Sequence, residues 1–261
     1  MTDSSTSAKD SAGPRAFGVD VGGSGIKGGI VDLTTGMLVG ERYKVLTPQP
    51  ATPEAVSRGV AEVVGHFNWD GPVGITLPGV ITGGTMRTAA NIDKGWIGTN
   101  TYDLFAKDLG GRDLSVVNDA DAAGMAEDAH GAGRGVDGVV MLLTFGTGIG
   151  SAILVNGTLV PNTELGHLIV GKKEAEHQAS SRVKDEKGWS YKKWAKKVSK
   201  VLDEYEALFW PSLFIAGGGI SRKADKWIPH LTNETKVVPA ALQNTAGIVG
   251  AAMAVDRGLK P

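Results

Sequence analysis

The feature that most constrains this chain is a strand, glycine loop and strand pattern that occurs twice. The first copy spans residues 17–32 and turns at Gly22-Gly23-Ser24; the second spans residues 142–156 and turns at Gly146-Thr147-Gly148. A turn and a third apolar run follow each copy, so each one predicts three strands joined by hairpins. Glycine leaves backbone N–H groups open to an anion, because no Cβ shields them. Two such loops predict a clamp on a chain of phosphates.

A dinucleotide-binding loop is the alternative, since Gly146-x-Gly148-x-Gly150 is similar to the GxGxxG motif. That motif opens a helix, whose N-terminus holds the pyrophosphate. Residues 151–155 instead predict a strand that ends at an Asn-Gly turn. One glycine loop inside a hairpin is more often a plain tight turn. The second copy, with matching flanks, favours the phosphate clamp.

Composition and element order predict an α/β fold. Apolar residues make up 41% of the 261 residues and charged residues 21%, which is typical of globular proteins. Strands alternate with helices in both halves, which predicts two related α/β domains with a ligand cleft between them. We expect a disordered tail at 1–13, an N-terminal domain at 14–117 and a C-terminal domain at 118–261. The final helix, at about 244–256, is free to pack back on the N-terminal domain.

Hydrophobic periodicity and turn residues place the remaining elements. The loop at 82–100 is polar and contains little that could pack, which is typical of a binding loop. Asp119 or Asp121 is expected to cap the helix that runs to about His130. Predicted helices are at 53–67, 103–109, 119–130, 174–183, 190–208 and 244–255, and predicted strands at 73–77, 114–117, 138–145, 212–216 and 237–238.

Charge is distributed unevenly, although the net charge is only −1. Residues 172–200 hold ten Lys or Arg and four acids, a balance of +6, so the rest of the chain carries −7. The helix at 190–208 has an apolar stripe from Tyr191 to Leu208, with Lys192, Lys193, Lys196, Lys197 and Lys200 mostly beside it. Such a charge run is a solvated face or a track for a polyanion longer than ATP, and the sequence leaves both open. The basic face lacks interleaved aromatic residues, so nucleic acid is a poorer partner.

Several classes of protein are excluded or disfavoured. With no cysteine, disulfides and thiolate zinc sites are excluded, and a reducing compartment is compatible. No apolar run reaches membrane length and the N-terminus lacks an export signal, so we expect a cytoplasmic protein without membrane contact.

Seven motifs stand in one order along the chain, and together they carry a family resemblance. They are Asp20-x-Gly-Gly-Ser24, Leu77-Pro78-Gly79, Asn91 with Gly95-Trp96, Asn118-Asp119-Ala120, Gly146-Thr147-Gly148-x-Gly150, Glu164-x-Gly166-His167 and Gly217-Gly218-Gly219. From about Ala16 to Val255 the chain resembles the ROK family (repressors, open reading frames and kinases), and within it the polyphosphate/ATP glucokinase and glucomannokinase branch. The resemblance implies the two-domain actin-like sugar-kinase fold, which is ribonuclease H-like.

The resemblance also implies roles for individual residues. Asp119 would be the general base that accepts the proton of the sugar hydroxyl. Asp20 would face Mg²⁺ through water. The implied sugar ligands are Asn91, Asn118, Glu164, His167 and Glu176. The implied donor-phosphate residues are Asp20, Gly22, Gly23, Ser24, Lys27, Gly146, Thr147, Gly148, Gly217 and Gly218.

Plainer interpretations of the same residues stay open. Asp119 could instead cap its helix, and Lys27 could be an exposed strand residue. A solitary His167 is more often structural, and Glu174 competes with Glu176 for the sugar role. Gly217-Gly218 could be a bare turn.

The family pattern sharpens the expected function. Many ROK proteins carry a cysteine-rich zinc site after the Gly-His element; this chain has none, so no structural zinc is expected. Only a short tail precedes the first strand, which disfavours the DNA-binding repressors. We expect a kinase, forming a homodimer, that transfers a terminal phosphoryl group from polyphosphate or ATP to the 6-hydroxyl of glucose, and also of mannose. The alternatives are an ATP-only kinase for another hexose and a non-catalytic sugar sensor.

Overall fold

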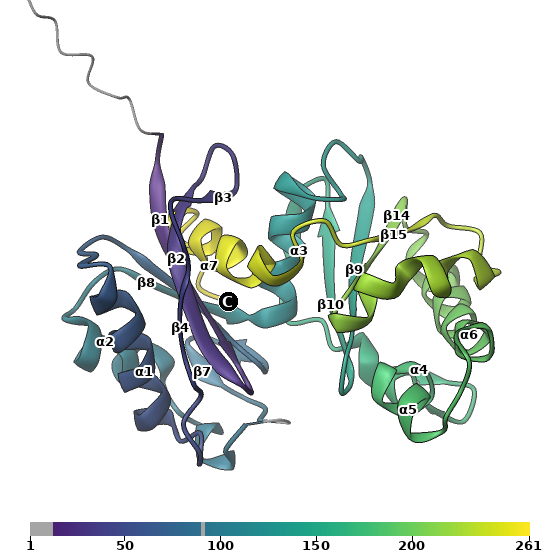
Figure 1. Ribbon diagram of the computed structural model, residues 1–261, viewed down its shortest axis with the longest axis horizontal. Helices are drawn as coiled ribbons and strands as arrows, with labels where there is room; N and C mark the ends of the chain where they lie inside the picture. Colours follow the sequence, from purple (N-terminus) through teal and green to yellow (C-terminus); the bar gives the residue numbers. More distant parts are fainter. Residues whose placement is uncertain (1–12, 90–91) are drawn as a thin grey trace, which may run out of the picture.

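The computed structural model describes residues 13–89 and 92–261 and consists of two halves, each built on one sheet (Figure 1). The expected tail before Gly13, and Asn91 with its sugar-binding role, lie outside the described residues. Two helices lie between the two sheets, and further helices cover the outer face of each sheet (Figure 1). Within the described ranges, no helix combines the length and apolar character needed to cross a bilayer.

The first sheet has the strand order β3-β2-β1-β5-β8, and β4 pairs with β2. Strands β1 and β2 form the first predicted hairpin, and β5 and β8 run parallel to β1. The carboxyl ends of these parallel strands therefore meet at one edge, where Asp20 pairs with Thr76 and Leu77 with Asn118. The bounds are β1 (Arg15–Gly22), β2 (Gly25–Asp32), β3 (Met37–Leu38), β4 (Tyr43–Val45), β5 (Val73–Leu77) and β8 (Leu114–Asn118).

The second sheet repeats this plan with the order β11-β10-β9-β14-β15. Strands β9, β10 and β11 are the second copy of the duplicated pattern, so the prediction of three strands joined by hairpins is confirmed in both halves. Strand β14 is parallel to β9, and Gly217 pairs with Thr144 at their carboxyl ends. The bounds are β9 (Val139–Phe145), β10 (Ile149–Val155), β11 (Thr158–Val160), β14 (Leu213–Gly217) and β15 (Val237–Pro239).

Helices form the layers around the sheets. Helices α1 (Pro53–His66) and α2 (Thr101–Leu109) pack on the outer face of the first sheet. Helix α6 (Tyr191–Phe209) packs on the outer face of the second, near α4 (Glu176–Ala179) and α5 (Ser181–Glu186). Helices α3 (Asp119–His130) and α7 (Ala246–Asp256) share the core between the sheets. The shorter elements are β6 (Ile81–Thr82), β7 (Thr85–Met86), η1 (Lys94–Trp96), η2 (Leu165–His167), β12 (Ile169–Val170), β13 (Lys173–Glu174), η3 (Gly219–Lys226), η4 (Ile228–His230) and η5 (Gln243–Thr245).

Side-chain alternation along the strands decides what faces the space between the sheets. Phe17, Val19 and Val21 of β1 enter the outer core with α1, so Gly18 and Asp20 point to the opposite face. In the same way β9 directs Leu142 into the central core, and Thr144 shares that face. Asp20 and Thr144 therefore approach the same space from opposite halves.

The backbone of helix α7 packs directly against the backbones of the first sheet and of α3. A Cβ built on Gly74 would lie 1.7 Å from the carbonyl oxygen of Ala251, and one on Gly18 would lie 1.8 Å from that of Ile248. On the other side of α7, a Cβ on Gly250 would lie 1.8 Å from a backbone oxygen of α3. Glycine is required at these positions because the two backbones leave no room for a methyl group.

Four local predictions were wrong. The loop at 82–100 does pack, because Met86 and Trp96 are fully buried and the Trp96 Nε1–H donates to the Ala51 carbonyl at 3.0 Å. The helix predicted at 174–183 is divided into β13, α4 and α5, since Ser180 is extended and caps α5 by accepting from Val183 N. Leu208, at the end of the predicted apolar stripe, is 54% exposed. The cap of α3 is neither aspartate, as described below.

Candidate active site

A pocket between the sheets collects residues from both halves. Asp20 enters it from β1 and Asp119 from the start of α3. The second half and α7 supply the opposite wall. The pocket is lined by Asp20, Asp119, Ala123, Glu127, Leu142, Thr144, Gly217, Gly218, Ala240, Gln243, Ala246 and Gly247.

Asn118 holds the start of α3 in place. Its Oδ1 accepts hydrogen bonds from Ala120 N at 2.8 Å and Asp121 N at 3.1 Å, so it is the N-cap that the sequence had assigned to Asp119 or Asp121. An Asn oxygen has two lone pairs, and both are used here. Its Nδ2 donates to the Gly79 carbonyl at 3.1 Å. The second N–H of Asn118 Nδ2 has no hydrogen-bond partner among the described residues.

Because Asn118 provides the cap, the carboxylate of Asp119 is free to face the pocket. Asp119 as a residue is exposed to solvent, but it lies in the wall of the pocket, where protein surrounds much of the side chain. Loss of water around the carboxylate, with the negative charges of Asp20 and Glu164, raises the pKa of Asp119 to about 6. The N–H of Ala120, which donates to Asp119 Oδ1 at 2.9 Å, opposes this rise. A carboxylate with a raised pKa in a cleft has the properties of a general base.

Asp121, two residues further along α3, is fully buried and connects the two halves. Its Oδ2 accepts from Asn162 N at 2.7 Å, and burial raises the pKa of Asp121 to about 7. The Asn162 side chain pairs with the backbone of Ile81 in β6, accepting at 3.0 Å and donating at 2.7 Å. Asn162 thereby fixes the segment that leads to Glu164 against the first half. Only the tertiary structure identifies Asn162, because the sequence around it shows no motif.

Asp20 is held by two neighbours at the carboxyl ends of the strands. Its Oδ1 accepts from Thr76 Oγ1 at 2.9 Å, and its Oδ2 forms an ion pair with Lys27 Nζ at 2.9 Å. Lys27 stands opposite Asp20 in the β1–β2 register, so it is a strand residue, but it is half-buried rather than exposed. Thr76 was missed by sequence analysis, although it stands just before the Leu77-Pro78-Gly79 motif.

The glycine loops differ in why they need glycine. A Cβ on Gly23 or Gly146 would meet no atom within 4 Å, and neither residue has a positive φ, so neither packing nor conformation of the protein demands glycine there. Gly218 has φ +78°, and a Cβ would lie 2.5 Å from the Phe145 carbonyl oxygen. No side chain covers the backbone of Gly23 or Gly146, although the Gly146 N–H already donates to the Gly148 carbonyl at 3.0 Å.

The loops do not all line the same pocket. The structure brings Gly217 and Gly218 together with Asp20 and Asp119. Gly22 and Gly23 line a second pocket with Thr47, Pro78 and Asp93, among other residues. Ser24 and Thr147 are exposed at the hairpin tips. In Figure 1 the β1–β2 and β9–β10 hairpins run in the same direction on either side of the gap between the halves.

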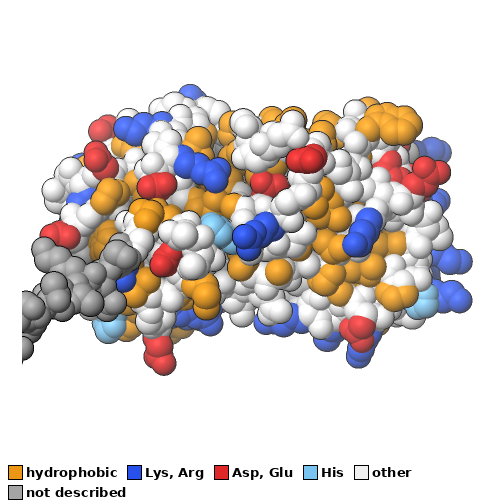
Figure 2. Space-filling model, turned by 90° about the horizontal axis from the view of Figure 1, so that it is seen from above, with side chains coloured by type: hydrophobic (Ala, Val, Ile, Leu, Met, Phe, Trp, Pro, Cys, Tyr) orange, Lys and Arg blue, Asp and Glu red, His pale blue; other side chains and the backbone are white. Residues whose placement is uncertain are grey.

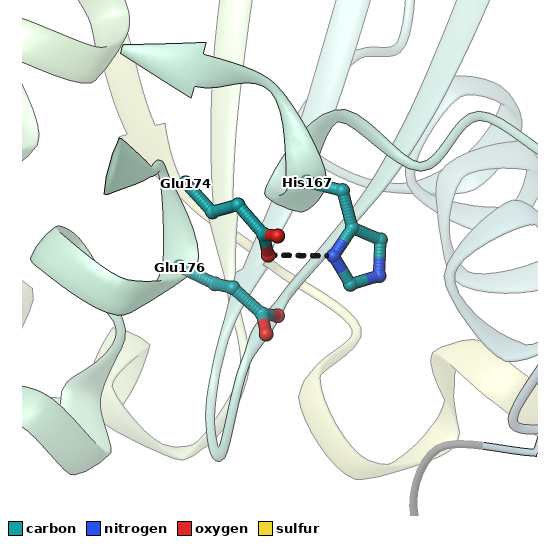
Figure 3. A group of neighbouring side chains, drawn as sticks. All are labelled: His167, Glu174 and Glu176. Atoms are coloured by element: carbon teal, nitrogen blue, oxygen red, sulfur yellow. Dashed lines mark hydrogen bonds and ion pairs between the residues drawn. The ribbon is translucent and has the colours of Figure 1, made fainter. Parts of the chain in front are cut away.

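The remaining proposed sugar ligands cluster beside the second glycine loop. Figure 3 shows the His167 ring with the carboxylates of Glu174 and Glu176 turned toward it. His167 Nδ1 lies 2.9 Å from Glu174 Oε2, and this hydrogen bond raises the pKa of His167 and lowers that of Glu174. His167 Nε2 lies 3.7 Å from Glu164 Oε2. Burial raises the pKa of Glu164, as does the charge of Glu176, while His167 opposes the rise.

Glu176 connects this cluster to the second glycine loop. Its Oε2 accepts from Ile149 N at 3.3 Å, and a Cβ on Gly148 would lie 2.3 Å from the same oxygen. Glu176, the implied sugar ligand, and its competitor Glu174 therefore have different positions: Glu174 orients His167, and Glu176 packs on the loop. The side-chain atoms of His167, Glu174 and Glu176 that could bind a metal ion lie within 4.8 Å of one another. The hydrogen bond between His167 and Glu174 already explains this proximity.

Glu127 is a further pocket residue that sequence analysis missed. Its buried carboxylate accepts from Ala132 N at 2.9 Å, Ala241 N at 2.9 Å and Leu242 N at 2.7 Å. These bonds tie the end of α3 to the segment that leads into α7. Glu127 therefore sets the position of one wall of the pocket.

Known proteins are similar to this chain along most of its length. A model described as ROK family matches residues 16–182. A polyphosphate glucokinase of Mycobacterium tuberculosis (strain CDC 1551 / Oshkosh) is 66% identical over 238 residues, which are 91% of this chain and 90% of that protein. A polyphosphate glucokinase of Mycobacterium leprae (strain TN) is 61% identical over 240 residues, 92% of this chain and 74% of that one.

Solved structures share the fold. The crystal structure of inorganic polyphosphate/ATP-glucomannokinase from Arthrobacter sp. strain KM has a TM-score of 0.88 at 48% identity, covering 94% of this chain and 99% of that one. A glucokinase from Streptomyces griseus, crystallised with glucose and AMPPNP, has a TM-score of 0.79 at 25% identity, with 94% and 100% covered.

Proposed function

This chain belongs to the ROK family, and from that premise we infer that it is a kinase that transfers a phosphoryl group from polyphosphate or ATP to glucose. Its fold is the actin-like, two-domain fold of the ROK sugar kinases. The observation that carries the proposed chemistry is the pocket in which Asp119, with a raised pKa, faces Asp20 and the Gly217-Gly218 turn. A carboxylate base beside a second carboxylate and a glycine turn is an arrangement that suits phosphoryl transfer to an alcohol.

Asp119 is proposed as the general base. It would accept the proton of the 6-hydroxyl of glucose while that oxygen attacks the terminal phosphorus of the donor, whose bond to the bridging oxygen breaks so that the shortened polyphosphate, or ADP, leaves. Its position at the first residue of α3, where Asn118 provides the cap, holds the carboxylate at the pocket. The positive end of the α3 dipole lies beside it, and this dipole favours the ionised form.

Donor binding is proposed at the glycine turns and Lys27. The bare backbone at Gly23 would donate its N–H to a phosphate oxygen, the Gly146-Thr147-Gly148 loop would border the donor, and the Lys27 ammonium would neutralise charge. Asp20 and Asp119 offer the hard oxygen atoms that Mg²⁺ prefers, and both Asp20 oxygens already have partners, so contact through water fits better than direct ligation. Mg²⁺, when bound, would neutralise developing charge on the phosphates.

Sugar binding is proposed at Glu164, His167 and Glu176, with the remaining N–H of Asn118. Carboxylates and imidazole bind ring hydroxyls by directional hydrogen bonds. Glu176 also contacts Gly148, so the acceptor and donor sites would share one residue. The role of Asn91, mannose as a second acceptor, a homodimer and a cytoplasmic location belong to the same proposal.

Product assays with each donor test the function directly. Glucose and Mg²⁺ are incubated in turn with long-chain polyphosphate and with ATP, and glucose 6-phosphate is measured. We expect product from both donors. Product from ATP alone, or from another hexose only, would favour the ATP-only kinase, and no product with retained glucose binding would favour the sugar sensor.

The raised pKa of Asp119 predicts an acidic limb in the pH profile. A base acts only when ionised, so kcat/KM for glucose should fall about tenfold per pH unit below about pH 6. The acidic limb should have the same midpoint with polyphosphate and with ATP, because the group that titrates is a side chain of the enzyme and not part of the donor. Asp121→Asn, which removes a neighbouring carboxyl group whose pKa is also raised, should keep this acidic limb. A profile that is flat from pH 7.5 to 5 contradicts the assignment.

A further inference from the structure

We propose that the polyphosphate chain, beyond the phosphates in the cleft, binds to one flank of α6 where two aromatic rings hold four lysine side chains. We call this surface the ring flank; it comprises Lys184, Trp189, Tyr191, Lys193, Lys197 and Lys226. The inference rests on the proposed function, because it assigns a place to the part of that donor that ATP lacks.

The rings organise the charges. Lys184 Nζ lies 4.5 Å from the centre of the Tyr191 ring, and Lys226 Nζ lies 6.0 Å from it. The Lys193 and Lys197 ammonium groups lie 5.4 and 5.8 Å from the Trp189 ring. A ring face attracts an ammonium group and restricts a flexible side chain, so less conformational entropy is lost when an anion binds. Lysines held in this way are better suited to anion binding than freely moving ones.

The ring flank is connected to both donor loops of the second half. Ser181 Oγ and Arg182 N at the start of α5 donate to the Gly146 carbonyl, at 3.0 and 3.1 Å, and α5 leads to Lys184. Helix η3, which begins after the Gly217-Gly218 turn, leads to Lys226. Both segments thus run from a glycine turn to the Tyr191 ring, where the lysines they carry meet.

Buried aromatic packing fixes the flank to the same loop. Phe145, the residue before Gly146, packs its ring against Trp194 at 5.8 Å and Trp227 at 5.7 Å. Trp194 is in the first turn of α6, and Trp227 follows Lys226. The lysines on this flank therefore have fixed positions relative to the second glycine loop.

Acidic neighbours limit which lysines are available. Lys184 is paired with Asp185 at 2.9 Å, and Arg182 with Glu186 at 3.8 Å. Among the described residues, no ion pair is found for Lys193, Lys197 or Lys226. These three carry the free positive charge of the flank, and basic side chains do project from this end of the molecule (Figure 2).

Three other lysines on the exposed face of the same helix provide the contrast. Lys192, Lys196 and Lys200 are exposed, and in the described part of the chain none of them lies over a ring. These lysines have the properties of a solvated face. The structure thereby divides the lysine run, which the sequence treated as one surface, into a ring flank and an outward face.

Polyphosphate needs such a surface and ATP does not. Each added phosphate brings about one more charge, and cations that bind it release counterions, so its binding weakens steeply with salt. ATP ends in adenosine after three phosphates. Lysines beyond the cleft should therefore act on the KM of polyphosphate alone.

Two double variants of α6 test the inference. Lys193→Gln/Lys197→Gln removes two charges from the ring flank, and Lys192→Gln/Lys196→Gln removes two from the outward face. Gln is close to Lys in helix propensity, so both keep α6. The ring-flank variant should raise the KM for long-chain polyphosphate about tenfold and lower its salt dependence by about one to two charges in the log–log slope. The KM for ATP should stay unchanged, as should both KM values of the control.

The possible outcomes separate this inference from the function it rests on. An equal rise in polyphosphate KM in both variants, or no rise in the ring-flank variant, overturns the inference while the function stands. A parallel rise in the ATP KM also overturns it, since the flank would then act on the cleft. If the wild-type enzyme does not use polyphosphate, polyphosphate as the proposed donor is refuted, and so is this inference. Unchanged ATP turnover reports that the variants are folded.

Discussion

An Asp119→Asn variant is expected to lose about 10²- to 10⁴-fold of kcat with either donor, which is the usual contribution of a general base. Asn keeps the shape of the side chain and removes its ability to accept a proton. The start of α3 should be unaffected, because Asn118 caps the helix and Asp119 does not. The measurement is steady-state kcat with saturating glucose.

Binding and folding controls make this result specific. Glucose affinity by calorimetry should change little, since the Asn Oδ1 can still accept a hydrogen bond from the 6-hydroxyl and the other proposed sugar contacts are unchanged. Asp121→Asn is the matched control: it changes a carboxyl group two residues away, and Asn can still accept from Asn162 N through its Oδ1. It should retain most of its turnover. An Asp119→Asn enzyme with more than about a tenth of wild-type kcat would remove Asp119 from the mechanism.

The two hairpin units could be predicted because their signals are local. Apolar runs, glycine turns and Asn156-Gly157 specify each strand and turn from neighbouring residues, and the strands formed as expected. Helix α7 was placed by its run of small residues. The face of the sheet toward which the Asp20 side chain points follows from the alternation of side chains along β1. Local signals of this kind were sufficient to predict the two halves of the fold and the sheet edge where the proposed site lies.

Other features depended on contacts between distant segments. Asn118, Asp119 and Asp121 are all good cap residues, and only the position of Gly79 beside Asn118 shows which of them turns toward the helix start. Trp96 looked like a loop residue because its partner, Ala51, is remote in sequence.

The candidate site shows the same limit. The contact of Glu176 with Gly148 and the bond of Asn162 to Ile81 join segments that no motif connects. Likewise, the division of the lysine run depends on where Trp189 lies beside α6. Sequence motifs identified which residues matter for the proposal, whereas the fold determined what each one can still bind.

A Gly74→Ala variant is expected to be the most strongly destabilised single-methyl change in the first sheet. The new Cβ would lie 1.7 Å from the Ala251 carbonyl oxygen, far inside any van der Waals contact. Both groups belong to backbones, in β5 and α7, so no side chain can rotate away and the helix must move off the sheet. Overpacking of this kind costs about 3 kcal/mol or more. For a chain of this size, Tm should fall by roughly 6–12 °C.

The displacement should also reach the proposed donor pocket, because α7 begins beside it. A Cβ on Gly247 would lie 2.7 Å from the Asp20 carboxyl carbon, so the helix start forms the wall next to Asp20. We therefore expect a higher KM for both donors in Gly74→Ala. Gly65→Ala in α1 is the matched control, since its Cβ would meet no atom within 4 Å, and Ala favours a helix. Its Tm should be unchanged or slightly raised. If Gly74→Ala melts within 2 °C of wild type, α7 does not pack on the sheet as closely as described.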